Sequence, residues 1–325
     1  MKMIKVHGSG NDFFILDEKQ VDKNLSEEEL KQLARHVCDR KTGLHGGSDG
    51  ILYVTGGHDD SVVGKMRVIN ADGSEASMCG NGIRTVARYL SEQNNLTDFK
   101  IETMYADLEV KKAKDFAPNV TAFDAEISPV SFAASDLKMH IDGKEKLFNE
   151  VVPELSKTLK FSAVAVPNPH LITFVDHDEL VGPELGRIAT YLNNGKNPIF
   201  PDGVNVSFVE VLADNNIFVR TFERGVGFTN ACGTAMSASS LIYSLLYASH
   251  TNLEDLITVR NPGGMVNTKV HQREDGSYWM SLIGNATFVA KVELSQERAL
   301  IGDFTDAKWI ATTEQAAYEN FVGSL

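Results

Sequence analysis

The chain is poor in cysteine, in basic residues and in long apolar runs, and each shortage argues against a class of protein. Its 325 residues include only three cysteines, without CxxC or Cys/His metal spacing, which argues against a disulfide framework and structural zinc. Asp and Glu number 44 against 31 Lys and Arg, so no nucleic-acid partner is expected. No run approaches the roughly 20 apolar residues of a membrane-spanning helix, and the first residues lack a signal-peptide core. We expect a cytoplasmic protein with no membrane partner.

An internal repeat is the strongest pattern that the sequence does contain. The offset of 153 residues that separates Cys79 from Cys232 also brings other short segments into register. It aligns Asp49-Gly50 with Asp202-Gly203, Asn70 with Glu223, and Cys79-Gly80-Asn81 with Cys232-Gly233-Thr234. Three matches in the same order at one offset predict a duplicated domain. The 42% hydrophobic content is sufficient for two cores.

Both copies share one sequence of expected elements. Two β-rich runs, such as VGKMRVIN and NIFVRTFE, precede a glycine-containing loop, and a helix follows at about 81–92 in the first copy and 234–248 in the second. This order predicts an α+β fold of two pseudo-symmetric domains, each a sheet wrapped around a central helix. The domains are expected at 1–128, with the segment 286–325 packed on it, and at 129–285. A helix at 26–38 and a helical tail after Ser295 have no counterpart in the repeat.

Cys79 and Cys232 each stand at the expected start of a helix. A helix N-terminus has unpaired N–H groups and a positive dipole end, which favour a thiolate and bind a carboxylate. If one thiolate removes a proton and a second thiol delivers one to the opposite face, a stereocentre is inverted. We find no lysine motif for a pyridoxal Schiff base and no metal-ligand cluster, so we expect neither cofactor nor metal. Cys38, in contrast, is expected to be core filler.

Five segments together resemble the signature of the diaminopimelate epimerase family. They are HGSGNDFFILD, MCGNGIRTVARYL, VPNPHLITFV, DGVNVSF and TFERGVGFTNACGTA, and they follow in order from residue 5 to about residue 235. The resemblance implies two similar domains with the active site in the cleft between them. It also implies cofactor-independent interconversion of LL- and meso-2,6-diaminopimelate, for lysine and cell-wall precursor synthesis.

Residue roles also follow from the resemblance. It implies that Cys79 and Cys232 are the acid/base pair, and that His170 and Glu223 lie near the thiols and tune their pKa. The distal carboxylate of the diamino diacid would pair with Arg224 and the distal ammonium with Glu223. The expected substrate contacts are Asn11, Asn70, Gly80, Asn81, Asn168, Asn205, Glu223, Arg224, Gly233 and Thr234.

The sequence departs from the family pattern in three places. Gly50 stands where some members have Gln, Ala235 stands where glycine often follows CGT, and the tail after Ser295 is longer than the pattern requires. We expect Ala235 to affect packing rather than chemistry. A homodimer is one option for the assembly. His7, His36, His45 and His58 are expected to be surface or structural residues.

Three alternative functions remain open at this point. A related racemase could act on another amino acid, although proline-type racemases typically carry His where this chain has Asn81. A cofactorless isomerase of the same fold could use a carboxylate instead of thiols, but both cysteines are present. A binding or redox-sensing protein could form a reversible Cys79–Cys232 disulfide without turnover. Exchange of a substrate α-proton in deuterated water, and replacement of each cysteine by alanine, separate these options.

Overall fold

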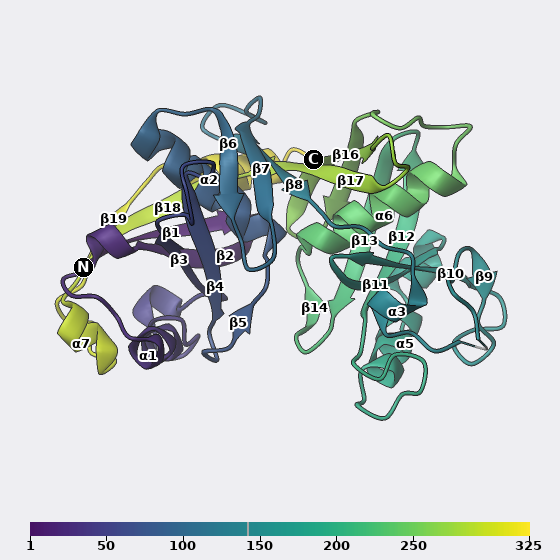
Figure 1. The fold of residues 1–325 in the computed structure, drawn as a ribbon, viewed down its shortest axis with the longest axis horizontal. Helices are drawn as coiled ribbons and strands as arrows, with labels where there is room; N and C mark the ends of the chain where they lie inside the picture. The colour runs from purple at the N-terminus through teal and green to yellow at the C-terminus, as the bar shows by residue number, and fades with distance from the viewer. Residues whose placement is uncertain (142) are drawn as a thin grey trace. The chain divides into compact units, whose positions relative to one another are not determined.

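A computed structural model describes residues 1–141 and 143–325 of the chain (Figure 1). The chain divides into two compact units. Unit 1 comprises Met1–Ala125 and Ile283–Leu325, and unit 2 comprises Glu126–Leu282. The tail after Ser295 therefore belongs to unit 1. Among the described residues, no helix combines the length and the apolar character that crossing a membrane requires.

Unit 1 is a mixed sheet with helices on both faces. Its helices are α1 (Glu27–Val37), α2 (Gly80–Asn94), α7 (Gln296–Leu300) and α8 (Glu314–Val322). Its strands are β1 (Lys2–Gly8), β2 (Asn11–Asp17), β3 (Gly50–Thr55), β4 (Gly64–Asn70), β5 (Glu75–Ala76), β6 (Asp98–Glu102), β7 (Asp107–Lys112), β18 (Thr287–Glu293) and β19 (Lys308–Ala311). The boundaries between the units fall inside β8 (Ala122–Ile127) and β17 (Tyr278–Asn285).

Unit 2 repeats this plan. Its strands are β9 (Glu150–Val151), β10 (Lys160–Val166), β11 (Asn168–Phe174), β12 (Asn205–Ala213), β13 (Asn216–Glu223), β14 (Gly227–Thr229), β15 (Ile257–Asn261) and β16 (Gly264–Gln272). Its helices are α3 (Ala134–Leu137), α4 (His177–Val181), α5 (Glu184–Leu192) and α6 (Gly233–Leu246). The expectation of an α+β fold with two related halves is confirmed.

The two units share the same series of strand pairings. In unit 1, β1 and β2 are antiparallel, β2 and β3 parallel, and β3 and β4 antiparallel; β4 then pairs antiparallel with β5 and parallel with β6. The series β10 to β15 follows the same order in unit 2, with β10 in the place of β1. The central helices α2 and α6 follow β5 and β14, and each begins at the glycine after its cysteine.

The alternation of apolar side chains in β2 explains why unit 1 needs a helix on each face of its sheet. Phe13 and Ile15 belong to the apolar cluster that contains α2, whereas Phe14 and Leu16 belong to the cluster that contains α1. Successive side chains of a strand point to opposite faces. A strand that is apolar on both faces must therefore be covered on both, and residues 80–91 of α2 are all buried.

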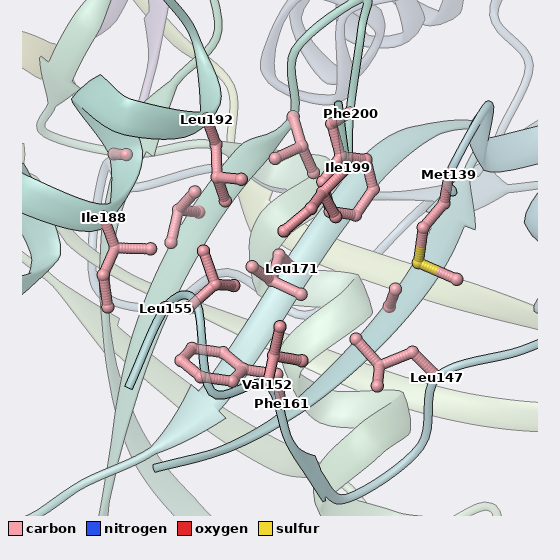
Figure 2. Packing of buried hydrophobic residues seen from close by; sticks show 14 of the residues in the cluster. Met139, Leu147, Val152, Leu155, Phe161, Leu171, Ile188, Leu192, Ile199 and Phe200 are labelled. Atoms are coloured by element: carbon pink, nitrogen blue, oxygen red, sulfur yellow. The ribbon is translucent and has the colours of Figure 1, made fainter. Parts of the chain in front are cut away.

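Unit 2 has a corresponding core on the face of its sheet that α5 covers. Leu171 of β11 lies at the centre of this cluster with Leu155 beside it, and Ile188 and Leu192 of α5 close one side (Figure 2). The central helix of unit 2, α6, contacts β10, β11, β12, β13, β15 and β16. Its residues 233–244 are buried, so the helix start that carries Cys232 is anchored by packing along its length.

One helix prediction is confirmed and another is partly wrong. The helix expected at 26–38 is α1, which Ser26 caps in a capping box with Glu29. The tail after Ser295, expected to be helical, contains strand β19, which pairs antiparallel with β18. The physical reason is local: Trp309 and Ile310 favour a strand, and β18 offers an edge with unpaired backbone groups. Only α7 and α8 of the tail are helical.

Candidate functional site

The first cysteine caps the central helix of unit 1. Cys79 is the N-cap of α2, with an extended backbone at φ −140° and ψ 112°, and its Sγ accepts a hydrogen bond from the Gly82 N–H at 3.3 Å. An N-cap acceptor satisfies one of the four unpaired N–H groups at a helix start. The half-buried Cys79 sulfur therefore lies where backbone N–H groups and the helix dipole favour a negative charge.

Asn11 is held against this sulfur by the turn that precedes it. Ser9 and Gly10 have φ of 53° and 80°, and two successive positive φ values characterise the tight hairpin turn that joins β1 to β2. Asn11 Oδ1 lies 3.5 Å from Cys79 Sγ and accepts from Asn81 Nδ2 at 3.2 Å. Its amide group donates to the Asp49 carboxylate. We call Asn11, Cys79, Gly80 and Asn81 the Cys79 site.

Asn70, the remaining substrate contact expected in unit 1, makes its side-chain hydrogen bond elsewhere. It ends β4 opposite Gly50, and its Nδ2 donates to Ser74 Oγ at 2.9 Å in the turn before β5. A side chain at position 50 has little room, because a Cβ there would lie 2.4 Å from the Ile69 carbonyl oxygen. Gly50 is thus required by the close approach of two backbones.

The second cysteine occupies the N-cap position of the central helix of unit 2 and is more deeply buried. Cys232 is 7% exposed, and its Sγ lies 3.5 Å from Thr234 Oγ1. Burial raises the pKa of Cys232 well above its ordinary value, and the nearby Glu223 carboxylate raises it further. Both effects favour the neutral thiol over the thiolate. We call Asn168, His170, Glu223, Cys232, Gly233 and Thr234 the Cys232 site.

His170 reaches the second cysteine through Thr234. Its Nε2 lies 3.0 Å from Asn168 Oδ1 and 3.1 Å from Thr234 Oγ1, and the Thr234 hydroxyl in turn faces Cys232. Burial lowers the pKa of His170 to about 3, because a fully buried imidazolium loses its hydration. His170 is therefore a neutral hydrogen-bonding group at physiological pH.

Glu223 and Arg224 close the end of β13. The Thr229 hydroxyl donates to Glu223 Oε1 at 2.6 Å, which orients the carboxylate. The backbone N–H of Arg224 donates to the side-chain oxygen of the buried Asn205 at 2.8 Å. The exposed Arg224 guanidinium donates to the Asp202 carbonyl at 3.0 Å. The Arg224–Asn205 bond joins two of the polar residues that the sequence predicts in the second half.

Asp49 and Arg84 contribute to the Cys79 site, and neither was predicted from the sequence. Asp49 orients the Asn11 amide, and Arg40 holds Asp49 through a 2.6 Å ion pair. Arg84 of α2 is fully buried and bonds to Asn81 Oδ1 at 3.1 Å. The repeat, in which Asp49 recurs as Asp202, was a sequence signal that could have identified Asp49. No comparable signal marked Arg84. Within the described residues, no group of three His, Cys, Asp or Glu side chains is placed to hold a metal ion.

Comparisons with known proteins agree on one family. The family model described as "Diaminopimelate epimerase" matches residues 3–124 and 162–289. A relative named "Diaminopimelate epimerase" from Ligilactobacillus salivarius is 71% identical over 325 residues, which covers 100% of this chain and 99% of the relative. A relative of the same name from Lactiplantibacillus plantarum is 62% identical over 327 residues, with 100% and 98% coverage.

Similar solved structures show the fold alone, because their sequences are distant. A Bacillus anthracis phenazine biosynthesis protein of the PhzF family has a TM-score of 0.63 at 16% identity, over 90% of this chain and 97% of that chain. A hydroxyproline epimerase from Agrobacterium vitis has a TM-score of 0.57 at 13% identity, over 88% of each chain.

Proposed function

Because the chain belongs to the diaminopimelate epimerase family, we propose that it interconverts LL- and meso-2,6-diaminopimelate without a cofactor. One observation carries the proposal: in two units with the same strand pairings, a cysteine followed by glycine occupies the N-cap position of a buried central helix. Cys79 and Cys232 are then an acid/base pair, with one cysteine contributed by each of two related halves. We propose the unit boundaries as the boundaries of the two epimerase halves.

The reaction needs one base and one acid on opposite faces of the α-carbon. One cysteine thiolate takes the α-proton and becomes a thiol, while the other thiol gives its proton to the opposite face and becomes a thiolate. Proton and charge balance, and the reverse reaction exchanges the two roles. The α-carboxylate binds the backbone N–H groups at the starts of α2 and α6, including those of Gly80, Asn81, Gly233 and Thr234, which also stabilise charge in the transition state.

Contacts with the rest of the substrate give specificity. We propose that Asn11, Asn70, Asn168 and Asn205 hydrogen-bond the substrate, since an amide donates to carboxylate and accepts from ammonium without adding charge. Arg224 pairs with the distal carboxylate and Glu223 with the distal ammonium. His170 and Glu223 also tune the Cys232 thiol, His170 through Thr234. A substrate without a charged far end would leave these groups unpaired.

The proposal extends to the role of the protein in the cell. Its partner is a small diamino diacid, and neither nucleic acid nor membrane is involved. The product would supply lysine and peptidoglycan precursor synthesis in the cytoplasm. Association as a homodimer remains part of the proposal, and sedimentation of the purified chain tests it.

A substrate panel in deuterated water tests the function. Diaminopimelate, proline and glutamate are incubated separately with the protein, and deuterium at the α-carbon is followed by NMR. We expect exchange with diaminopimelate alone; exchange with another amino acid but not with diaminopimelate would contradict the proposal. Cys79→Ala and Cys232→Ala should each abolish inversion. Cys38→Ala is the matched control, since Cys38 is buried beside α1 and should leave turnover unchanged.

A further inference from the structure

Arg84 is a fully buried cation beneath the start of α2. Its exposed fraction is 0%, and its three hydrogen bonds all go to uncharged oxygens. Nη1 donates to the Gly80 carbonyl at 3.0 Å, Nη2 to Asn81 Oδ1 at 3.1 Å, and Nε to the Asn285 carbonyl at 3.5 Å. Burying a charge without an ion-pair partner is costly. In the part of the chain that the structure describes, no carboxylate forms a salt bridge with it.

Two glycines make the space that this guanidinium occupies. A Cβ on Gly284 would lie 2.7 Å from Arg84 Cζ, and a Cβ on Gly8 would lie 2.9 Å from Nη2. Contacts this short do not occur between real side chains. Gly8 is in β1 and Gly284 in β17, and both belong to unit 1 with Arg84. The buried charge is therefore accommodated by backbone on two sides of the side chain.

Arg88, one helical turn later, shows the ordinary way in which this helix stabilises an arginine. Arg88 is bonded to Glu92 at 2.7 Å and to both carboxylate oxygens of Glu314. The two arginines lie on the same helix and are both buried, yet only Arg88 has its charge neutralised by carboxylates. Among the residues that the structure describes, Arg84 therefore keeps a positive charge without a salt-bridge partner at the helix end that carries Cys79.

Four titratable groups interact with Arg84, from four elements. They are Cys79 at the start of α2, His7 of β1, Asp124 of β8 and Tyr318 of α8. Burial lowers the pKa of His7 to about 4 and raises that of Tyr318 to about 12, so both are neutral near pH 7. Asp124 lies 3.6 Å from Lys111. Burial lowers the pKa of Arg84 to about 10, so Arg84 stays protonated near neutral pH.

We propose that Arg84 is a positioning residue that stabilises the Cys79 thiolate and fixes the Asn81 amide beside it. The inference rests on the proposed function and extends it to the resting state of the same site. The bond from Arg84 Nη2 to Asn81 Oδ1 turns the Asn81 NH2 toward Asn11. The bond to the Gly80 carbonyl ties the guanidinium to the residue next to Cys79. One buried cation thereby sets both the charge of the sulfur and the orientation of its neighbour.

The pH dependence of Cys79 alkylation tests this directly. Wild type, Arg84→Gln and Arg84→Lys are treated with iodoacetamide at a series of pH values, and the Cys79 peptide is quantified by mass spectrometry. Only the thiolate reacts, so the midpoint of the profile reports its formation. We expect Arg84→Gln to raise this midpoint by about one pH unit or more, which slows alkylation at pH 7 roughly tenfold. Arg84→Lys, which keeps the charge, should restore most of the reactivity.

Arg88→Gln is the matched control, because it removes a buried arginine from the same helix without removing the unpaired cation. It should lower stability and leave the Cys79 midpoint unchanged. An unchanged midpoint in folded Arg84→Gln would overturn the proposal. If Arg84→Gln does not fold, the wild-type midpoint decides: it should lie below the ordinary cysteine value of about 8.5, and a midpoint at or above it would overturn the proposal.

The alkylation assay contains no substrate, so it separates the two hypotheses. A raised midpoint in a protein that does not epimerise diaminopimelate would contradict the proposed function and support the role of Arg84. Normal epimerisation by wild type, together with a Cys79 alkylation midpoint that Arg84→Gln leaves unchanged, would support the proposed function and contradict the role of Arg84. The acid limb of the kcat/KM profile should move in the same direction as the alkylation midpoint, which a merely structural role would not produce.

Discussion

The Cys79 thiol donates a hydrogen bond to the side-chain oxygen of Asn11, 3.5 Å away. This bond stabilises the protonated sulfur, whereas the Gly82 N–H and the Arg84 charge stabilise the thiolate. A general acid/base works best when neither form strongly dominates at the operating pH. The opposing contacts at Cys79 supply such a balance.

Asn11→Leu removes the acceptor for the thiol while it keeps most of the side-chain volume. Because the protonated form of Cys79 loses its partner, and because Asn11 is a proposed substrate contact, kcat/KM for diaminopimelate should fall roughly 100-fold. Initial rates of inversion followed by circular dichroism measure the effect. A change of less than about threefold would contradict the role assigned to this contact.

Asp49 acts one step further from the sulfur. It accepts from the Asn11 amide and is held by Arg40, so Asp49→Ala releases the orientation of that amide. We expect kcat/KM to fall about tenfold, with little loss of stability because the ion pair is exposed. Asp49→Asn keeps an acceptor oxygen and should recover part of the rate. Equal rates for wild type and Asp49→Ala would exclude this orienting role.

Burial is the larger cause of the raised pKa of Cys232, and the nearby Glu223 carboxylate raises that pKa further. Glu223→Gln removes that negative charge, so the Cys232 thiol should ionise at a lower pH than in wild type. Alkylation of Cys232 at pH 8.5 should accordingly become several-fold faster. The Cys79 peptide from the same digest is the internal control. Slower alkylation of Cys232 in the variant than in wild type would contradict this effect of Glu223.

The tail after Ser295 is tied to the Cys79 helix by a partly buried ion pair. Both Glu314 oxygens accept from Arg88, whose side chain is 10% exposed. Glu314→Ala leaves that cation without its bidentate partner and should lower the free energy of unfolding by about 3 kcal/mol. Urea denaturation measures this loss. The double variant Arg88→Met, Glu314→Met should regain most of it, and no regain would argue against the pair as the cause.

Gly284 and Gly186 should respond in opposite ways to the same substitution. Gly284→Ala places a Cβ against the Arg84 guanidinium and should cost about 1 to 3 kcal/mol. Gly186 lies inside α5, and a Cβ added there would lie at an ordinary contact distance of 3.5 Å from the Phe228 ring. Gly186→Ala should therefore stabilise the protein by about 1 kcal/mol. Thermal unfolding of the two variants compares them. Similar effects would show that the Gly284 contact does not constrain the packing.

The repeat made much of the fold predictable, because local rules and tertiary structure agree there. Each central helix begins at the glycine after its cysteine, within one residue of the expected start, and the helix expected at 26–38 is α1. The strand at Lys308–Ala311 could not be predicted in the same way. Its formation depends on the edge of β18, which is close in space but not in the local sequence pattern.

The candidate site was predictable where a residue type itself carries the chemistry. Both cysteines stand at the helix starts that the sequence predicts, and Glu223 is the last residue of β13. Arg84 was not predictable, because an arginine within IRTVARY is expected on an exposed helix face. Its burial depends on Gly8 and Gly284, which only the folded chain brings to one point.

The origin of the hydrogen at the inverted carbon tests the central claim most directly. LL-diaminopimelate is incubated with wild type in deuterated water, and the first few per cent of meso product is analysed by NMR and mass spectrometry. The two-cysteine account predicts deuterium at the inverted centre of nearly every product molecule, while the remaining LL substrate still carries protium. Product that retains its original α-hydrogen would indicate a single base and would contradict the account.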